Sequence, residues 1–280
     1  MSQEKLQSKA KALLESNEAD LIIGYQKGYV ANSTRPIFIT QPEDIGRLVL
    51  NPFCHNNLAV YLTKHEIKKW GRPAIVAKTE DIRSIIVLVQ EFQIKAEDMT
   101  ILGFNCPELG NPDAAVSLYE AARIEDYERI LANETKGTEL AGETFDELDG
   151  LLAMSPEERF NFWQEEFSRC IKCYACRAAC PLCYCERCIT EVNQPLWIEP
   201  SAHPRGNWAW NFARAWHLAG RCVLCGACER ACPVDIPLML LNAALAREVA
   251  EKFDYLPGYH SKIAPPLATF SPDDEAAFIH

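Results

Sequence analysis

Short apolar runs alternate with amphipathic segments in the first part of the chain, up to about residue 110. Four of the runs are compact and rich in strand-forming residues, and they span residues 20–25, 36–40, 73–78 and 99–104. Apolar residues recur at helical spacing in residues 3–17, 42–50, 56–70 and 79–93. Strand, helix and strand in close succession predict a right-handed βαβ unit and a small parallel sheet.

The second half of the chain has a helical pattern. Residues 113–168 are strongly acidic, and Ser155 before Pro156 predicts a helix N-cap there. Helical periodicity returns in residues 207–222 and 236–253. The fold class is therefore α+β, with an α/β domain, an acidic helical connector, a cysteine-bearing helical domain and an extended C-terminal arm at residues 1–112, 113–168, 169–255 and 256–280. The arm is rich in proline and apolar residues, so we expect it to lie on a partner subunit.

Composition and charge narrow the classes of function. The chain has 280 residues, and its 28 basic and 39 acidic side chains give a net charge of −11, which argues against nucleic-acid binding. The apolar runs fall short of the roughly 18 to 20 residues needed to cross a bilayer, so no membrane span is expected. The N-terminal residues are charged and show no signal-peptide pattern, which predicts a cytoplasmic protein with reduced thiols.

Thirteen cysteines are present, and eleven of them lie between Cys170 and Cys232. Two runs share the spacing C-x2-C-x2-C-x3-C-P, at Cys170, Cys173, Cys176 and Cys180 and again at Cys222, Cys225, Cys228 and Cys232. This is the spacing of bacterial ferredoxins, in which three cysteines of one run and the last cysteine of the other hold each [4Fe-4S] cluster. Zinc and disulfides are the alternatives, although zinc sites more often pair two separated C-x2-C knuckles.

The ferredoxin arrangement assigns all eight of these cysteines. We expect the first cluster to be held by Cys170, Cys173, Cys176 and Cys232. We expect the second cluster to be held by Cys222, Cys225, Cys228 and Cys180. Five cations within the cysteine region would offset the negative charge of the clusters, namely Lys172, Arg177, Arg187, Arg221 and Arg230. Simple solvation at the surface explains these cations nearly as well.

Five cysteines remain once the two runs are assigned. Three of them, Cys183, Cys185 and Cys188, form C-x-C-x2-C directly after the first run. This spacing is too tight for disulfides among the three and indicates a third [4Fe-4S] cluster, while three inert core thiols are the alternative. Cys106 is the preferred fourth ligand because the end of a parallel strand is where a sheet presents functional groups, and Cys54 is the second choice.

Residues 181–221 separate the two runs and include a helical segment, whereas a small ferredoxin joins its runs by a short loop. In this respect residues 165–255 resemble the α-helical ferredoxin domain in the iron-sulfur subunits of succinate dehydrogenases and heterodisulfide reductases. More narrowly, "CYACRAACPLCYCERC", "RAWHLAGRCVLCGACERACP" and "TEDIRSIIVLVQEFQIKAEDMTILGFNC" are similar to the β subunits of deazaflavin-reducing hydrogenases and formate dehydrogenases. They are also similar to the iron-sulfur subunits that accompany heterodisulfide reductase in anaerobes.

The resemblance implies an iron-sulfur subunit that relays single electrons within a multi-subunit anaerobic oxidoreductase. Its implied partners are a catalytic oxidoreductase subunit and other electron-transfer subunits. Some β subunits of that family bind FAD. This chain has no G-x-G-x-x-G run, which argues against bound FAD in this chain. The alternative is a flavin-containing subunit that itself reduces a deazaflavin or nicotinamide-type acceptor. No convincing acid-base or nucleophile set is visible, so no catalytic residue is assigned.

Overall fold

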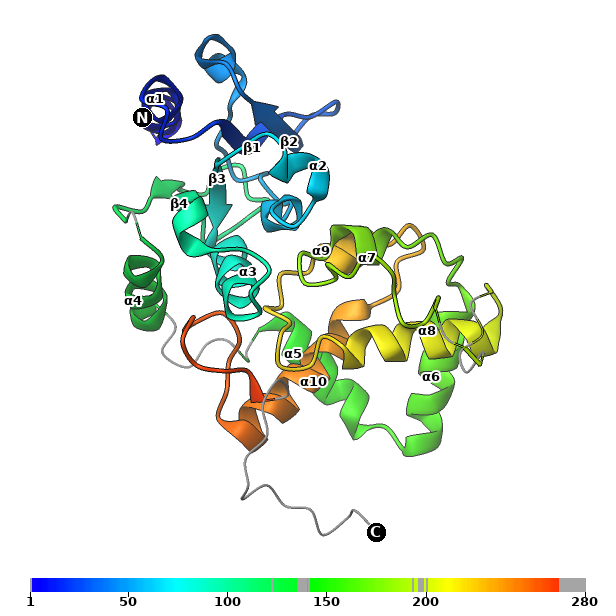
Figure 1. Cartoon of the computed structure of the whole chain (residues 1–280). Coiled ribbons are helices and arrows are strands. Elements are labelled where there is room, and N and C mark those ends of the chain that lie inside the picture. Colours follow the sequence, from blue (N-terminus) through cyan, green and yellow to red (C-terminus); the bar gives the residue numbers. More distant parts are fainter. Residues whose placement is uncertain are drawn as a thin grey trace.

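The computed structural model describes residues 2–121, 123–134, 140, 142–192, 194–195, 199 and 201–266. A five-stranded sheet lies in the N-terminal half, and helices form the C-terminal half (Figure 1). The strands are β1 (Leu21–Lys27), β2 (Thr34–Ile39), β3 (Pro73–Lys78), β4 (Thr100–Asn105) and β5 (Ser117–Leu118), in the order β2-β1-β3-β4-β5. All four strands expected from the sequence are therefore present.

The sheet is mixed rather than parallel. β3 pairs in parallel with β1 and with β4, whereas β2 and β5 pair antiparallel at the two edges. The expected parallel sheet is thus confirmed for the three inner strands and wrong for both edges. Residues 28–33 alone join β1 to β2, and a parallel return needs a crossover of about a dozen residues or more. β5 lies within residues 113–168, where the sequence pattern predicts only helix.

Two helices pack against the sheet. α1 (Ser2–Glu15) contacts β1 and β5, and α3 (Thr79–Gln90) contacts β3 and β4. The segments 42–50 and 56–70 form only short turns of helix, namely η1 (Pro42–Arg47), η2 (Leu58–Tyr61) and α2 (His65–Lys68), and η3 (Ala96–Asp98) precedes β4. β1 is buried continuously from Leu21 to Tyr25, as expected for a strand that is covered on both faces.

The C-terminal half is built from helix pairs. Its helices, with the preceding α4, are α4 (Ile124–Glu134), α5 (Glu143–Ala153), α6 (Pro156–Ser168), α7 (Ala175–Ala179), α8 (Pro204–Trp216), α9 (Ala227–Arg230) and α10 (Leu238–Phe253). α5 packs against α10, α6 against α8 and α7 against α9. The predicted cap is confirmed, because the Ser155 hydroxyl accepts from the Glu158 N–H while the Glu158 carboxylate accepts from the Ser155 N–H. The described part of residues 169–255 contains no strand.

The described part of the C-terminal arm lies against α3 of this same chain. Nη2 of Arg83 donates a 3.0 Å hydrogen bond to the Pro257 carbonyl, and Nε2 of Gln90 donates a 2.7 Å hydrogen bond to the His260 carbonyl. Gly258 (φ 85°) allows this close approach, since a Cβ there would lie 2.6 Å from the Arg83 carbonyl oxygen. Residues 267–280 of the expected arm lie outside the described residues.

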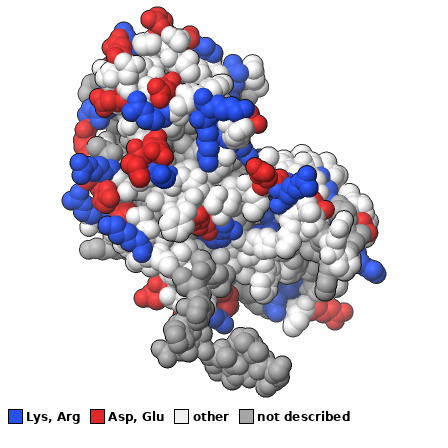
Figure 2. All heavy atoms as spheres, in the orientation of Figure 1, with Lys and Arg blue, Asp and Glu red and all other residues white. Residues whose placement is uncertain are grey.

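The surface carries both signs of charge. Figure 2 shows acidic and basic side chains interspersed over one face of the molecule, above all on the α/β half. In the described ranges, no helix combines the length and the apolar composition that a bilayer crossing requires.

Candidate iron-sulfur centres

The two cysteine runs fold into the same local backbone. In the first run Lys172 (φ 51°) and Tyr174 (φ 60°) adopt the left-handed conformation on either side of the second cysteine. In the second run Leu224 (φ 59°) and Gly226 (φ 67°) do the same. The short helices α7 and α9 begin at the next residue of each run and contact each other. Alternating left- and right-handed residues turn successive N–H groups toward one concave face, which suits an anionic cluster.

Four thiols gather at the second run. Burial raises the pKa of the Cys222 thiol, and three neighbouring thiols raise it further. They belong to Cys228, Cys225 and Cys180, of which Cys180 comes from the first run. The Cys228 sulfur also accepts a 3.6 Å hydrogen bond from Nδ2 of the buried Asn242. The thiol of Cys180, from the first run, therefore lies among the thiols of the second run.

The first run packs into the helical half. Cys170, Cys176 and Cys232 all contact the apolar cluster formed by α5, α6 and α10. Burial raises the pKa of Cys176 to about 11, and the thiols of Cys228 and Cys170 contribute to this rise. Cys173 is exposed at the surface. The structure thus brings Cys170 and Cys176 together, places Cys232 in the same apolar surroundings and leaves Cys173 open to solvent.

The arrangement of these thiols fits clusters better than single ions. Within the part of the chain that is described, no three His, Cys, Asp or Glu side chains converge closely enough to hold one metal ion. A structural zinc site requires four ligands within about 2.0–2.3 Å of the ion. A cubane cluster holds its thiolates farther apart, because each of them binds a different iron atom. The cysteines present therefore suit [4Fe-4S] clusters.

Arg214 on α8 is a buried cation next to both runs. The residue is only 4% exposed, and its Nη2 donates a 3.0 Å hydrogen bond to the Cys176 carbonyl. Burial opposes the charge of the guanidinium, but the thiols of Cys228, Cys183 and Cys180 among others hold its pKa above the ordinary value. Because Arg214 lies outside the cysteine runs, the sequence does not predict it as a functional residue. The available signal was an arginine between apolar residues near the end of a helical segment.

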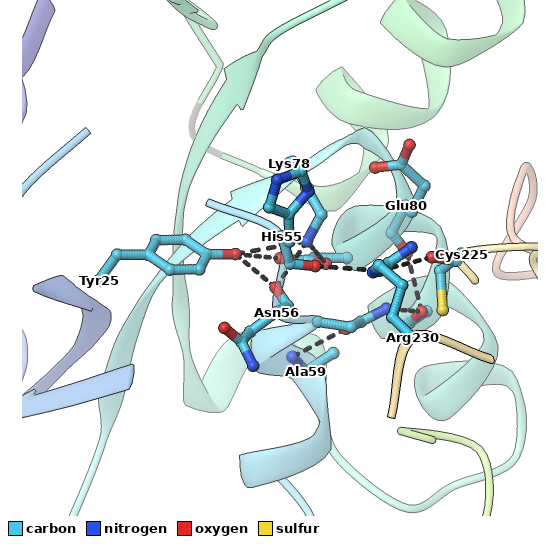
Figure 3. A network of polar contacts seen from close by, with 11 residues as sticks. Tyr25, His55, Asn56, Ala59, Lys78, Glu80, Cys225 and Arg230 are labelled. Carbon is cyan, nitrogen blue, oxygen red and sulfur yellow. Dashed lines mark hydrogen bonds and ion pairs between the residues drawn. The ribbon is translucent and has the colours of Figure 1, made fainter. Parts of the chain in front are cut away.

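A short loop of the α/β half contacts the second run (Figure 3). Nη2 of Arg230 donates hydrogen bonds to the carbonyl oxygens of His55 (3.1 Å) and Cys225 (2.9 Å). Nζ of Lys78, at the end of β3, donates a 2.6 Å hydrogen bond to the Asn56 carbonyl. The carboxyl edge of the sheet is thereby connected to the second run through two backbone carbonyls.

Lys78 also belongs to a buried ion pair. Its Nζ lies 2.6 Å from Oδ1 of Asp81, and both side chains are almost fully buried. The Tyr25 hydroxyl donates to the Asn56 carbonyl at 2.6 Å and lies 3.2 Å from Oδ2 of Asp81. Burial raises the pKa of Asp81 to about 6, although Lys78 opposes this rise. A buried charge pair that is also hydrogen-bonded fixes the edge of the sheet beneath the second run.

The five remaining cysteines separate into two groups. Cys106 directly follows β4, as expected, and Cys54 is completely buried in the core of the α/β half. Cys183, Cys185 and Cys188 instead line a cavity of about 390 Å³ between the first run and α8. Neither Cys106 nor Cys54 is among the described residues that line this cavity. The joint third site of Cys106 with these three thiols stays a prediction.

These features define the class of the protein, and comparison with known families agrees. Residues 217–237, which contain the second cysteine run, match the family model of the 4Fe-4S binding domain. The chain is therefore an iron-sulfur protein of the 4Fe-4S type, as its cysteine spacing predicts.

Two curated relatives extend this assignment. The F420-dependent formate dehydrogenase subunit beta of Methanocaldococcus jannaschii is 36% identical over 104 residues, which cover 37% of this chain and 27% of that protein. The F420-dependent formate dehydrogenase 1 subunit beta of Methanococcus maripaludis is 30% identical over 110 residues, which cover 39% of this chain and 28% of that protein. The matched region thus spans little more than a quarter of either relative. The resemblance to iron-sulfur β subunits of formate dehydrogenases is confirmed.

Proposed function

We propose that this chain is the iron-sulfur electron-transfer subunit of a multi-subunit oxidoreductase and that it holds two cross-ligated [4Fe-4S] clusters. One cluster is held by Cys170, Cys173, Cys176 and Cys232. The other is held by Cys222, Cys225, Cys228 and Cys180. The observation that carries the proposal is the thiol of Cys180, which belongs to the first run but lies among the thiols of the second. Such a crossing of the fourth cysteine is the signature of two-cluster ferredoxins.

The side chains of the protein supply binding, shielding and charge. When bound, the clusters supply one-electron redox centres, which no side chain of this chain provides. Trp210 is 1% exposed and packs edge-on against Tyr174, with 4.6 Å between ring centroids, so it keeps water from the first run. Arg214 places a buried positive charge beside both runs, which favours the more negative, reduced form of each centre.

The names of the relatives support one type of complex. Their names describe subunits of F420-dependent formate dehydrogenases, which favours a formate dehydrogenase-type complex over a hydrogenase or heterodisulfide reductase type. The partners would then be a catalytic oxidoreductase subunit and further electron-transfer subunits. Anaerobic affinity purification from the native host, followed by mass spectrometry, tests this part of the proposal. Recovery of the chain alone, without any redox subunit, would contradict it.

The visible spectrum of the purified protein separates a relay from a flavin-containing subunit. We expect the broad shoulder of iron-sulfur clusters without the resolved bands of a flavin. Bound FAD in stoichiometric amount would favour the alternative, in which this chain itself reduces a deazaflavin or nicotinamide-type acceptor.

Matched pairs of cysteine variants test the cross-ligation. Cys232→Ala should alter the same electron paramagnetic resonance signal as Cys170→Ala, because both residues hold one cluster. Cys180→Ala should alter the same signal as Cys222→Ala. The proposal fails if Cys232→Ala and Cys222→Ala alter one signal in common, since each run would then hold its own cluster. Iron analysis of each variant shows whether the other cluster is retained.

A further inference from the structure

The cavity of about 390 Å³ beside α8 contains an unused set of metal ligands. Three of its lining residues are Cys183, Cys185 and Cys188, which the two runs leave unassigned. A fourth lining residue is His217, which directly follows α8. We infer that this cavity is a third iron-sulfur site, in which three cysteines and one histidine hold a [4Fe-4S] cluster. This inference goes beyond the proposed function, which requires only the two ferredoxin-like sites.

The ligand set fits a cluster. Thiolates and imidazoles are the ligands that iron-sulfur centres use, and histidine replaces cysteine on one iron in some of them. The three thiols and the imidazole do not converge on one point, since no three such side chains in the described ranges lie close enough to hold a single ion. They surround an open volume instead. A structural zinc site draws its ligands to one point, whereas an open volume lined by the ligands suits a larger polynuclear centre.

The charge of the cavity wall suits an anionic centre. Four arginines and no acidic side chain occur among the described lining residues, and the arginines are Arg177, Arg187, Arg214 and Arg221. Arg214 is 4% exposed, and its Nε is buried without a hydrogen-bond partner in the described structure. A buried N–H donor without a partner costs about 1–3 kcal/mol. A sulfide or thiolate of a bound cluster is an acceptor that would satisfy it.

Hydrogen bonds hold the cysteine segment in place. Nη2 of Arg177 donates hydrogen bonds to the carbonyl oxygens of Cys185 (2.7 Å) and Glu186 (3.1 Å). The Thr190 hydroxyl donates a 3.2 Å hydrogen bond to the sulfur of Cys188. These contacts fix the backbone at Cys185 and the orientation of the Cys188 thiol, as the hydrogen bonds around a metal ligand commonly do.

The cavity wall is also hydrogen-bonded to the α/β half. The Tyr184 hydroxyl, within the C-x-C motif, donates a 2.9 Å hydrogen bond to Oε2 of Glu91 at the end of α3. Nη2 of Arg221 donates a 2.8 Å hydrogen bond to the same oxygen, and its Nη1 donates a 3.0 Å hydrogen bond to the His217 carbonyl. The site thus lies where the two halves meet.

The fourth ligand in this inference is His217, whereas the sequence favours Cys106 in that role. The thiol of Cys106 lies next to Glu108 and Glu80, and burial raises its pKa. The thiol of Cys54 lies next to Asn51, 3.9 Å from its side-chain oxygen. Neither cysteine lines the cavity, whereas His217 does.

The position of the cavity indicates how a cluster bound there would exchange electrons. The thiol of Cys183 lies next to the thiol of Cys180, which belongs to the proposed second cluster. His217 is exposed, and it follows Trp216, which is 64% exposed. These residues connect the second run to the surface, so a redox partner protein could give or take one electron there without any bond being formed or broken.

Iron analysis of the full-length, anaerobically purified chain provides the first test. The third site predicts about twelve iron atoms per chain rather than about eight, at four per cluster. Pulsed electron paramagnetic resonance of the reduced protein should show hyperfine coupling to an imidazole nitrogen. His217→Cys should keep about twelve iron atoms and abolish the nitrogen coupling, whereas Cys106→Ser should change neither.

Three results would overturn the inference. They are about eight iron atoms with Cys183, Cys185 and Cys188 open to alkylation, one bound zinc ion in place of the extra iron, and loss of the extra iron in Cys106→Ser. In each case the signals of the two ferredoxin-like clusters persist, so the proposed function stands. Loss of those two signals from the unmodified chain would instead refute the proposed function.

Discussion

The two cysteine runs share a backbone but differ in their surroundings. Cys170 and Cys176 of the first run pack among the helices of the C-terminal half, and Cys173 is exposed. Cys222 and Cys225 of the second run pack against the large core that includes the sheet. The motif itself sets the local ligand geometry, whereas the elements packed around each run determine its exposure to water and to neighbouring charges.

The two sites therefore meet different amounts of solvent and charge. Solvent exposure and nearby charge are among the factors that set the potential of an iron-sulfur cluster. Cys173 of the first run is exposed, whereas none of the four cysteines of the second run is. The second run is connected, through Arg230 and the loop at His55 and Asn56, to the buried Lys78–Asp81 pair of the α/β half.

The largest effect should come from Lys78, beneath the second run. Lys78→Met removes one partner of a buried ion pair and leaves Asp81 uncompensated, which costs about 3–5 kcal/mol. Because burial already raises the pKa of Asp81 to about 6, its carboxyl can bind a proton as the pH falls. The folded state then holds a proton that the unfolded state releases, so the loss should be greater at pH 8 than near pH 6. Anaerobic urea unfolding at both pH values measures it.

Two controls show whether charge is the cause. Lys172→Met changes a lysine of the first run that donates a 3.2 Å hydrogen bond to the Glu199 carbonyl, and it should cost under about 1 kcal/mol. The double variant Lys78→Met with Asp81→Leu should recover much of the loss, because no buried charge remains unpaired. If the double variant is as unstable as Lys78→Met, packing rather than charge explains the loss.

The next effect concerns the first run. Nδ2 of Asn207 donates 2.8 Å hydrogen bonds to the carbonyl oxygens of Phe167 and Cys170, and the residue is 1% exposed. Asn207→Leu leaves two buried carbonyls without this donor and should lower the free energy of unfolding by about 1–3 kcal/mol. Anaerobic urea unfolding tests this loss, with Asn111→Leu on the exposed surface as the control. A loss equal to that of the control would show that the carbonyls find other donors.

A smaller effect should follow from the left-handed positions. Gly226→Ala places a Cβ at a φ of 67° and 2.6 Å from Nη1 of Arg230, which must then shift. The left-handed conformation costs a non-glycine residue about 1–2 kcal/mol, so unfolding should become easier by about that amount. Gly46→Ala, which meets no atom within 4 Å, is the matched control and should be nearly neutral. Equal stabilities of the two variants would show that the backbone at the second run can relax.

The inner strands and the cysteine spacing could be predicted because their signals are local. β1 and β3 are buried along most of their length and read as continuous apolar runs. The antiparallel edges could not be predicted, since the direction of β2 depends on the length of a turn and β5 spans only Ser117–Leu118. Helical spacing in residues 56–70 produced only short helical turns, because tertiary packing overrides a periodic pattern.

Some features of the candidate site could likewise be predicted from the sequence, and others could not. The identity of the cysteines follows from their spacing, but the left-handed conformations of Lys172 and Leu224 have no signal in the sequence, where glycine marks only one of the four such positions. The role of Arg214 depends on which face of α8 meets the cysteines, which is a property of the packed structure. The place of His217 in a cavity with three thiols likewise depends on contacts between distant segments.

The smallest effect should distinguish the two runs electronically. Nδ2 of Asn242 donates to the sulfur of Cys228, whereas Asn207 donates only to backbone carbonyls, so Asn242 alone acts on a ligand atom. Hydrogen bonds to cluster sulfurs raise the reduction potential. A bond with a net contribution of about 0.5–1.5 kcal/mol corresponds to about 20–60 mV for a one-electron couple. Asn242→Leu should therefore lower the potential of the second-run cluster by that amount in an anaerobic redox titration. The first-run cluster is the internal control, and an equal shift of both potentials would show that the amide acts through the fold rather than through the sulfur.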